Sequence, residues 1–348
     1  MGDDGYLHNL ESGDLMKEPH EPLVSVITPA YNMGRFLPEC IESVLAQTYR
    51  NFEYIIVDNC STDGTPEIVE RYARTDKRIH VYRNERLLEI IANHNRAFRL
   101  ISSNSKYCKV VSADDWLFPE CIVRMVSLAE ANPSVGIVGS YQLSGGGTDW
   151  RLWRVKWDEL PYPSTVIPGH EICRRYLLGG PYVFGTPTSI LYRADLVRCE
   201  DSFYPNSTAE ADTSACIKYL SASDFGFVHQ VLSYERVHQA QMSTTSKELH
   251  AYWLSKVSDL REYGSIYLTA GELEGRLNEL MEQYYELLAA SAVNFRERAF
   301  WAHHEKRLKE IGYPLHRGKL AKAISLKLLD LLLNPKQTID KLFGRDTQ

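Results

Sequence analysis

The sequence predicts an α/β fold in which helices flank a mostly parallel β-sheet. Between residues 22 and 143, short apolar runs alternate with segments of helical periodicity. Strands and helices that alternate in this way form βαβ units, whose strands run parallel. From residue 246 onward the pattern is almost entirely helical, so we expect a helical extension in the C-terminal part of the chain.

The individual elements follow from apolar periodicity and from the turn residues between the runs. Apolar runs rich in valine, isoleucine and tyrosine predict strands at residues 23–31, 52–58, 79–84, 107–115 and 135–143. Helical periodicity between them predicts helices at residues 36–47, 66–73, 88–102 and 118–131. After an irregular stretch rich in tryptophan and proline, we expect a glycine-rich loop and a strand within residues 179–197, a helix at 209–220 and a strand at 224–238.

Composition and charge exclude several classes of protein. The formal net charge is −6 and no basic stretch before residue 240 is interleaved with aromatic residues, so nucleic acid is not an expected partner. The 7 cysteines are scattered without a CxxC pair, which argues against a disulfide framework and against a zinc knuckle. The first residues lack the apolar core of a signal peptide, and no apolar run reaches the roughly 18 residues of a membrane span. We therefore expect a cytoplasmic protein.

Two adjacent acids, Asp114 and Asp115, stand where a predicted strand gives way to a helix. Ligands of α/β sheets bind at the carboxyl ends of the strands, and Tyr31 and the pair Asp58–Asn59 follow the first two strands. Hard divalent cations such as Mg²⁺ and Mn²⁺ prefer carboxylate and phosphate oxygens. Acids on a tight turn therefore suit a metal-bridged nucleotide. The alternative from the residues alone is a pair of solvated turn acids that cap the following helix.

Several motifs in this order resemble those of the family 2 glycosyltransferases. They are VSVITPAYN at residues 24–32, IIVDNCSTDGT at residues 55–65 and VVSADDWLFPE at residues 110–120. The match extends over residues 22–238. It implies the GT-A fold, a Rossmann-like nucleotide-sugar fold, over residues 22–245. This leaves a polar N-terminal tail at residues 1–21 and the helical extension at residues 246–348.

The resemblance assigns roles to the residues that match the family's motifs. Asp212, in EADTSA, would be the general base, with Glu210 as the competing candidate because the motif can be aligned two residues earlier. Asp115, Asp114 and the late histidine His238 would bind the metal ion. The nucleotide sugar would be bound by residues at strand ends, on one helix and in the glycine-rich loop, namely Pro29, Tyr31, Asp58, Asn59, Asn95, Asp114, Gly185 and Thr188.

Two positions depart from the family's pattern. The family commonly has two aspartates where this chain has Asp58 and Asn59. An asparagine carbonyl accepts a hydrogen bond from the ring N–H of uracil as a carboxylate does, so a UDP-sugar stays the favoured donor. The family also often has an acid at the position of Ser112, which leaves Asp114 and Asp115 as the acids of the metal site.

The resemblance implies transfer of a sugar from a nucleotide-diphosphate donor with inversion, assisted by Mn²⁺ or Mg²⁺. The acceptor would be a hydroxyl group of a glycan or of a lipid-linked sugar in bacterial cell-surface polysaccharide synthesis. Two alternatives remain open, a nucleotide-sugar binding module without activity and a sugar nucleotidyltransferase. The nucleotidyltransferase needs a glycine-rich phosphate loop after the first strand, where this chain has TPAYNMGRF with one glycine and one arginine.

The last predicted helix has an apolar face and a basic flank. Its apolar residues are Leu320, Ile324, Leu328, Leu331 and Leu332, and its basic residues are Lys319, Lys322, Lys327, Lys336, Lys341 and Arg345. Such a helix can lie in a membrane interface, which would make the protein peripheral on the cytoplasmic face of the inner membrane. The alternative, with equal weight, is a helix packed against the catalytic domain or against a partner subunit of an oligomer.

Overall fold

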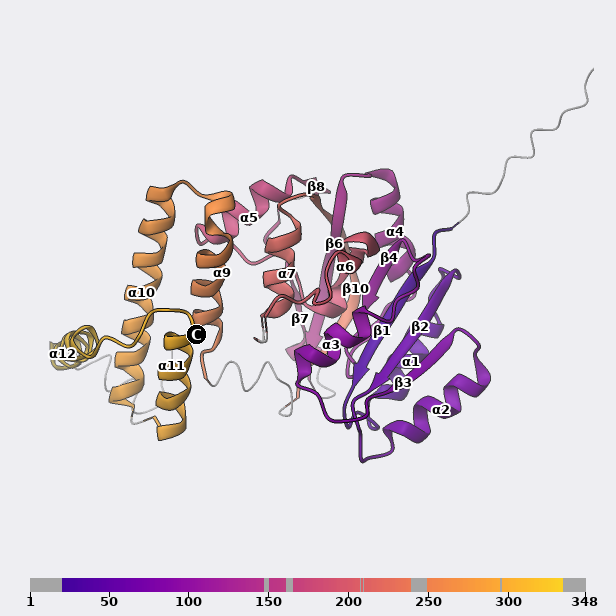
Figure 1. The fold of residues 1–348 in the computed structure, drawn as a ribbon, viewed down its shortest axis with the longest axis horizontal. Coiled ribbons are helices and arrows are strands. Elements are labelled where there is room, and N and C mark those ends of the chain that lie inside the picture. Colours follow the sequence, from indigo (N-terminus) through magenta and orange to yellow (C-terminus); the bar gives the residue numbers. More distant parts are fainter. Residues whose placement is uncertain are drawn as a thin grey trace, which may run out of the picture.

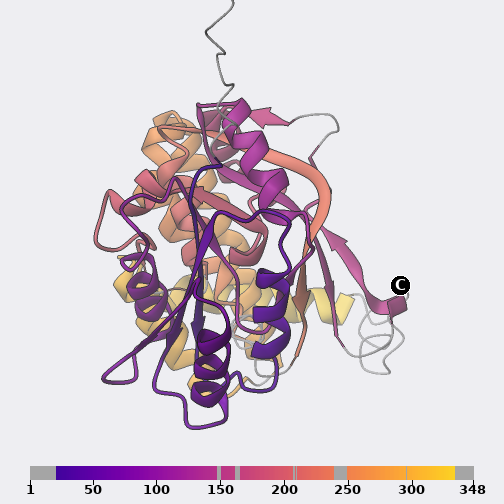
Figure 2. The same ribbon diagram turned by 90° about the vertical axis from the view of Figure 1, so that its right-hand side faces the viewer.

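The structure is a computed structural model, and it describes residues 21–146, 150–160, 165–206, 208, 210–238, 249–294 and 296–333. Most of the predicted N-terminal tail lies outside these ranges, as do Lys336, Lys341 and Arg345 of the last predicted helix. Figures 1 and 2 show a central sheet with helices on both faces and a group of helices beside it. The predicted α/β fold with a helical C-terminal segment is confirmed.

The described strands lie in one sheet. Their bounds are β1 (Val24–Ala30), β2 (Phe52–Asp58), β3 (Ile79–Arg83), β4 (Tyr107–Val110), β5 (Trp116–Leu117), β6 (Val135–Gly145), β7 (Arg154–Lys156), β8 (Val166–Ile167), β9 (Ile190–Arg193) and β10 (Asp224–Arg236). Every residue of β1 is buried, as expected for a parallel strand that is covered by helices on both faces.

The sheet is parallel in its first half and mixed in its second. The strand order is β3-β2-β1-β4-β9-β6-β10-β5, and the pairs from β3 to β4 are all parallel. Beyond β4, β9 is antiparallel to both of its neighbours, so the sheet as a whole is mixed where we expected it to be mostly parallel. The direction of β9 follows from its entry point: the chain reaches it from the short helix η2 (Pro187–Ser189), which lies against β4. This arrangement brings the glycine-rich loop to the carboxyl end of β4.

Helices cover both faces of the sheet and enclose two apolar cores. Their bounds are α1 (Leu37–Leu45), α2 (Thr65–Thr75), α3 (Ile90–Phe98), α4 (Cys121–Ala131), α5 (Gly169–Leu177), α6 (Ala194–Arg198), α7 (Ala211–Tyr219), α9 (Tyr252–Tyr267), α10 (Ala270–Val293), α11 (Arg298–Glu310) and α12 (Arg317–Leu333). One core contains Tyr54 and Ile56 of β2 with residues of α1 and α4, and the other contains Ile55 and Val57 with residues of α3, α5 and α7. The side chains of β2 thus alternate between the two faces.

The helical extension continues the second of these cores. Buried residues of α9, α10 and α11 belong to the same apolar cluster as α5 and α7. Figure 1 shows α9, α10 and α11 side by side next to α5 and α7, with α12 at the far end of the molecule. Among the described helices, none combines the length and the apolar content needed to cross a membrane.

Candidate active site

The ends of β1 and β2 bring the first group of predicted site residues together. Ala30 pairs with Asp58 across the two strands, so Pro29 and Tyr31 lie beside Asp58 and Asn59. The loop after β1 is connected to the loop after β2 by hydrogen bonds, one of which joins the Asn32 amide to Ser61 Oγ at 2.9 Å. Tyr31 is 43% exposed, so its ring is free to stack on a planar ligand.

One carboxylate oxygen of Asp58 makes no hydrogen bond within the described protein. Its Oδ1 accepts a hydrogen bond from the Ser61 amide at 3.0 Å. Its Oδ2 lies 3.3 Å from Arg83 Nε but is buried without a hydrogen-bond partner, because the geometry of that ion pair is poor for one. A ligand N–H group would satisfy this oxygen.

The two predicted asparagines are engaged by the protein's own backbone. Asn59 exchanges two hydrogen bonds of 2.9 Å with the backbone of Leu88, and its carbonyl also accepts one from Asn84. Asn95 in the same way pairs with the backbone of Tyr204. Their amides therefore fix the loop after β3 and the segment near residue 204. An N–H group of a base could reach the Asn59 carbonyl only by replacing one of the two bonds that it accepts.

The acids after β4 point to different partners. Asp115 is 4% exposed, and its oxygens accept hydrogen bonds from Thr188 Oγ1 at 2.6 Å and from the Arg236 amide at 3.0 Å. Asp114 Oδ2 instead lies 2.9 Å from His238 Nε2. The short strand β5, which pairs with β10, brings these distant residues together. Burial and the charge of Asp114 raise the pKa of Asp115 well above its ordinary value.

These groups suit a divalent cation in their chemistry, because carboxylate oxygens and imidazole nitrogens are common ligands of such ions. In the structure Asp114 Oδ2 and His238 Nε2 contact each other directly at 2.9 Å. A cation there would also relieve the repulsion between Asp114 and Asp115. Within the described ranges no cluster of three or more ligating side chains occurs, so water or a ligand would supply the remaining positions.

Two basic residues that the sequence analysis did not single out support this site. Arg236 donates from Nε to the carbonyl of Asp114 at 3.0 Å, pairs with Glu39 and lies over the ring of Trp116. Lys109 is fully buried and donates to the carbonyls of Thr188 and Ile190. Burial lowers the pKa of Lys109 to about 8. A lysine within the apolar run YCKVV was the available signal in the sequence.

The glycine-rich loop connects the acid pair to helix α7. Thr188 Oγ1 donates to Asp115 and accepts from the Ser112 amide at 3.1 Å. At the other end of the loop, the Tyr182 hydroxyl donates to the carbonyl of Gly185 at 2.7 Å and lies 2.9 Å from Thr213 Oγ1 on α7. Gly185 adopts a φ of +101°, in the left-handed region that glycine favours.

Asp212 lies in the first turn of α7, next to Thr213. Burial raises the pKa of Asp212 to about 8, and the charge of Glu210 adds to the effect. A carboxyl group with a pKa near neutrality is suited to accept a proton at physiological pH. Glu210 occupies the N-cap position of the same helix, so both candidate bases lie at one end of α7.

A third acid reaches α7 from the helical extension. Asp259 on α9 is 2% exposed and accepts a hydrogen bond from Ser214 Oγ at 2.6 Å. Burial raises its pKa to about 7, and its Oδ2 has no hydrogen-bond partner. Its charge contributes to the raised pKa of Asp212. Nothing in the sequence marked Asp259, because its role depends on the docking of α9 against α7.

Solved structures with a similar fold bind nucleotide sugars. Residues 1–349 of S. aureus TarS in complex with UDP-GlcNAc superpose with a TM-score of 0.62 at 15% identity, covering 86% of this chain and 89% of that one. The mannosyltransferase PcManGT from Pyrobaculum calidifontis, in complex with GDP-Man and Mn²⁺, gives a TM-score of 0.51 at 16% identity, covering 89% and 88%. At these identities the likeness establishes the fold alone.

Sequence comparisons establish the family. GlyG, a glycosyltransferase of Streptococcus pneumoniae, is 31% identical over 279 residues, which cover 76% of this chain and 89% of GlyG. TuaG of Bacillus subtilis, a putative teichuronic acid biosynthesis glycosyltransferase, is 34% identical over 129 residues, which cover 37% of this chain and only 50% of TuaG. The model of glycosyl transferase family 2 matches residues 25–199. The chain therefore belongs to glycosyl transferase family 2 and is a glycosyltransferase with the GT-A fold.

Proposed function

We propose that the protein transfers a sugar from a nucleotide-diphosphate donor to a hydroxyl group of a glycan or lipid-linked acceptor, with inversion and with Asp212 as the general base. The observation that carries this proposal is the loop from Gly185 to Thr188. Its one end is bonded to Asp115 and its other end is connected through Tyr182 to the helix of Asp212. The expected binding site of the diphosphate and the expected base are thus coupled by one short segment.

Asp212 would accept the proton of the acceptor hydroxyl as the new glycosidic bond forms. A free hydroxyl is a weak nucleophile, and a positioned base contributes roughly 10²–10⁴ to the rate of such a step. The raised pKa of Asp212, about 8, makes it a stronger base than an ordinary aspartate. The loop that contains Gly185 would order the acceptor and exclude water from the donor.

A divalent ion, Mn²⁺ or Mg²⁺, would be bound by Asp114, Asp115 and His238. The oxygens of Asp115 also accept hydrogen bonds from Thr188 and from the Arg236 amide. The chemistry of the ion is to neutralise the charge that develops on the departing diphosphate. The Mn²⁺ in the PcManGT complex supports the use of such an ion in this fold. On the protein side, Arg236 restrains the turn through the Asp114 carbonyl and adds positive charge beside it.

We favour a UDP-sugar as the donor. Asp58 Oδ2, which makes no hydrogen bond within the described protein, suits the N–H of a uracil ring, and Tyr31 offers an exposed ring beside it. The TarS complex shows UDP-GlcNAc bound by a related fold. The name of TuaG, a putative teichuronic acid biosynthesis glycosyltransferase, supports an acceptor from bacterial polysaccharide synthesis.

The protein would be peripheral at the membrane through α12. None of its residues is buried, and leucines face solvent along it, with Leu326, Leu328, Leu329, Leu332 and Leu333 between 47% and 78% exposed. Lys319, Lys322 and Lys327 supply positive charge for anionic lipids. One side of this helix packs against the protein, because Leu320 and Ala323 contact the apolar core. A protein truncated after residue 316 should lose binding to anionic vesicles, and unchanged partitioning would refute this placement.

A nucleotide-sugar panel tests the function. UDP-, GDP-, dTDP- and CMP-sugars are incubated with the full-length protein, with Mn²⁺ or with a chelator, and donor hydrolysis and binding are measured. Metal-dependent hydrolysis of a UDP-sugar, with Asp212→Asn binding the donor normally but transferring at least about 100-fold more slowly, is expected. Near-normal turnover of Asp212→Asn would place the base elsewhere. Donor hydrolysis that is equally fast with Mn²⁺ and with the chelator would exclude a role for the metal ion.

A further inference from the structure

A pocket with a volume of about 300 Å³ lies beside the predicted donor site, between the loop after β3 and helix α3. Its lining residues are Asn84, Glu85, Arg86, Leu88, Arg96 and Arg99. None of the residues assigned above to the donor, the metal ion or the base is among them. The pocket therefore adjoins the predicted donor site without containing any of its assigned residues.

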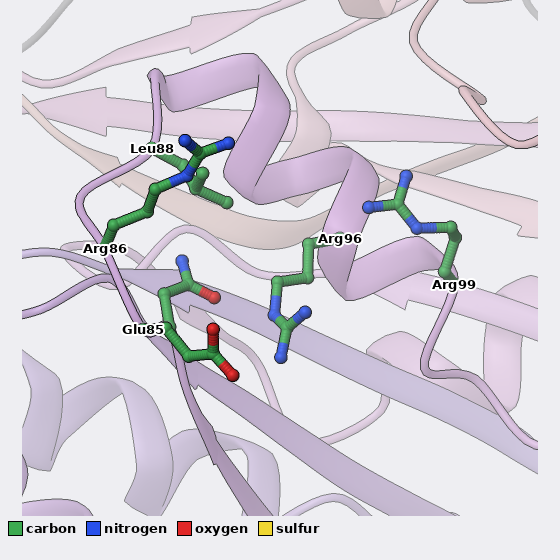
Figure 3. Close-up of a pocket in the computed structure, with 6 residues that line it drawn as sticks. Glu85, Arg86, Leu88, Arg96 and Arg99 are labelled. Carbon is green, nitrogen blue, oxygen red and sulfur yellow. The ribbon is translucent and has the colours of Figure 1, made fainter.

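Positive charge dominates this pocket. Three guanidinium groups and one carboxylate line it, although the whole chain carries a formal net charge of −6. Figure 3 shows Arg96 and Glu85 directed toward one another, with Arg86 near the N-terminal turn of α3 and Arg99 near its other end. Arg99 is partly engaged, since it donates to the carbonyl of Asp201 at 3.0 Å. A ligand here would meet a net charge of about +2.

Two buried polar atoms of the pocket lack partners within the described protein. Arg96 Nε is a buried donor without an acceptor, and Asn84 Oδ1 is a buried acceptor without a donor. The Asn84 side chain is only 5% exposed, and its amide nitrogen is already bonded to Asn59 and Asn93. Buried polar groups of this kind are normally satisfied, so the pocket lacks an acceptor for Arg96 and a donor for Asn84.

We propose that this arginine pocket binds an anionic sugar unit, meaning a sugar that carries a phosphate or a carboxylate group. Guanidinium groups form paired, charge-assisted hydrogen bonds with both kinds of anion. The carboxylate of Glu85 and the free carbonyl of Asn84 accept hydrogen bonds from sugar hydroxyls. The volume lies at the lower end for ligand pockets, which suits a single small unit. The proposal rests on the proposed function insofar as a glycan acceptor supplies such units.

The pocket is connected to the donor site through Asn59. Asn84 lines the pocket and donates to Asn59 Oδ1 at 2.7 Å, and Leu88 donates to the same oxygen at 2.9 Å. Asn59 directly follows Asp58, the residue expected at the nucleotide base. Binding of an anionic unit against Arg86 and Arg96 therefore orders the loop on which the donor site rests.

Calorimetric titration of the full-length protein tests the proposal. Glucose 1-phosphate and glucuronic acid are the two anionic probes, and glucose is the neutral control. At least one anionic probe should bind, glucose should not, and R96Q should weaken binding about tenfold, as expected for a lost charge-assisted hydrogen bond. The matched control is R74Q, which changes an arginine that is 80% exposed on α2 and should leave binding unchanged. The probe that binds more tightly identifies phosphate or carboxylate as the preferred group.

Three results would overturn the proposal: no binding of either anionic probe, glucose binding as tightly as the anions, or R96Q binding like the wild type. If His238→Ala weakens binding while R96Q does not, the probe lies in the donor site. Because the titration measures binding and not transfer, it tests the arginine pocket independently of the proposed function. A donor panel without transfer, combined with binding that depends on Arg96, refutes only the proposed function. Transfer combined with R96Q binding like the wild type refutes only the arginine pocket.

Discussion

The pH dependence of transfer distinguishes Asp212 from Glu210 as the general base. Burial raises the pKa of Asp212 from 3.8 to about 8, and the charge of Glu210 is the second cause. A general base acts in its deprotonated form, so kcat/KM should fall about tenfold for each pH unit below that pKa. An aspartate with an ordinary pKa of about 3.9 would give a flat profile over the same range.

The decisive variant is Glu210→Gln, which removes this charge and preserves the shape of the side chain. Of the causes that raise the pKa of Asp212, the charge of Glu210 is second only to burial. Each pKa unit by which the variant lowers that value corresponds to about 1.4 kcal/mol of repulsion removed. Because the repulsion raises the pKa of Asp212, the variant should move the acid limb of the profile toward lower pH and increase the rate at pH 6.

The assay is the initial rate of transfer from pH 5.5 to 9.5 at low donor concentration, so that kcat/KM reports the free enzyme. Asp259→Asn should shift the limb in the same direction by less, since its charge raises the pKa of Asp212 less than the charge of Glu210 does. Glu262→Gln, on the exposed side of α9, should not shift it. Loss of transfer in Glu210→Gln with activity retained in Asp212→Asn would make Glu210 the base. A flat profile in the wild type would refute the raised pKa.

Variants at three further positions test the loop and the metal site. Thr188→Val removes two hydrogen bonds and should lower the free energy of unfolding in urea by about 1–3 kcal/mol, whereas Thr188→Ser should restore most of it. Gly185→Ala would place a Cβ atom 2.2 Å from Ser189 Oγ at a φ of +101°, so the melting temperature should drop by several degrees; an unchanged value would mean another loop conformation. His238→Ala should raise the Mn²⁺ concentration for half-maximal activity about tenfold, and an unchanged requirement would remove His238 from the metal site.

The first half of the fold was predictable because its signals are local. The expected strand at residues 52–58 coincides with β2 (Phe52–Asp58), and the strands before and after it were placed within a few residues. Each is a short apolar run bounded by turn residues, which needs no knowledge of distant contacts. The same local logic placed Asp58, Asp114 and Asp115 at the carboxyl ends of parallel strands.

The hydrogen-bond partners of the site residues are far away in the sequence and were not predictable. Thr188 and Asp115 are 73 residues apart, and His238 and Asp114 are 124 residues apart. Periodicity carries no information about which oxygen meets which donor across such separations. For the same reason the sequence suggested Asn59 as a contact for the base, whereas the structure shows its amide bonded to the loop after β3.

The helical extension is joined to the catalytic helix by polar bonds as well as by apolar packing. Ser214 on α7 donates to Asp259 on α9, and the Tyr267 hydroxyl at the end of α9 donates to the carbonyl of Ile217. Ile217, Leu260 and other residues of both segments belong to one buried cluster. Removing the extension would expose this cluster and leave the Ser214 hydroxyl, two residues from Asp212, donating only its longer bond of 3.3 Å to the carbonyl of Glu210. The expected boundary near residue 245 therefore marks a change in sequence pattern, while the surroundings of the proposed base are built from both sides of it.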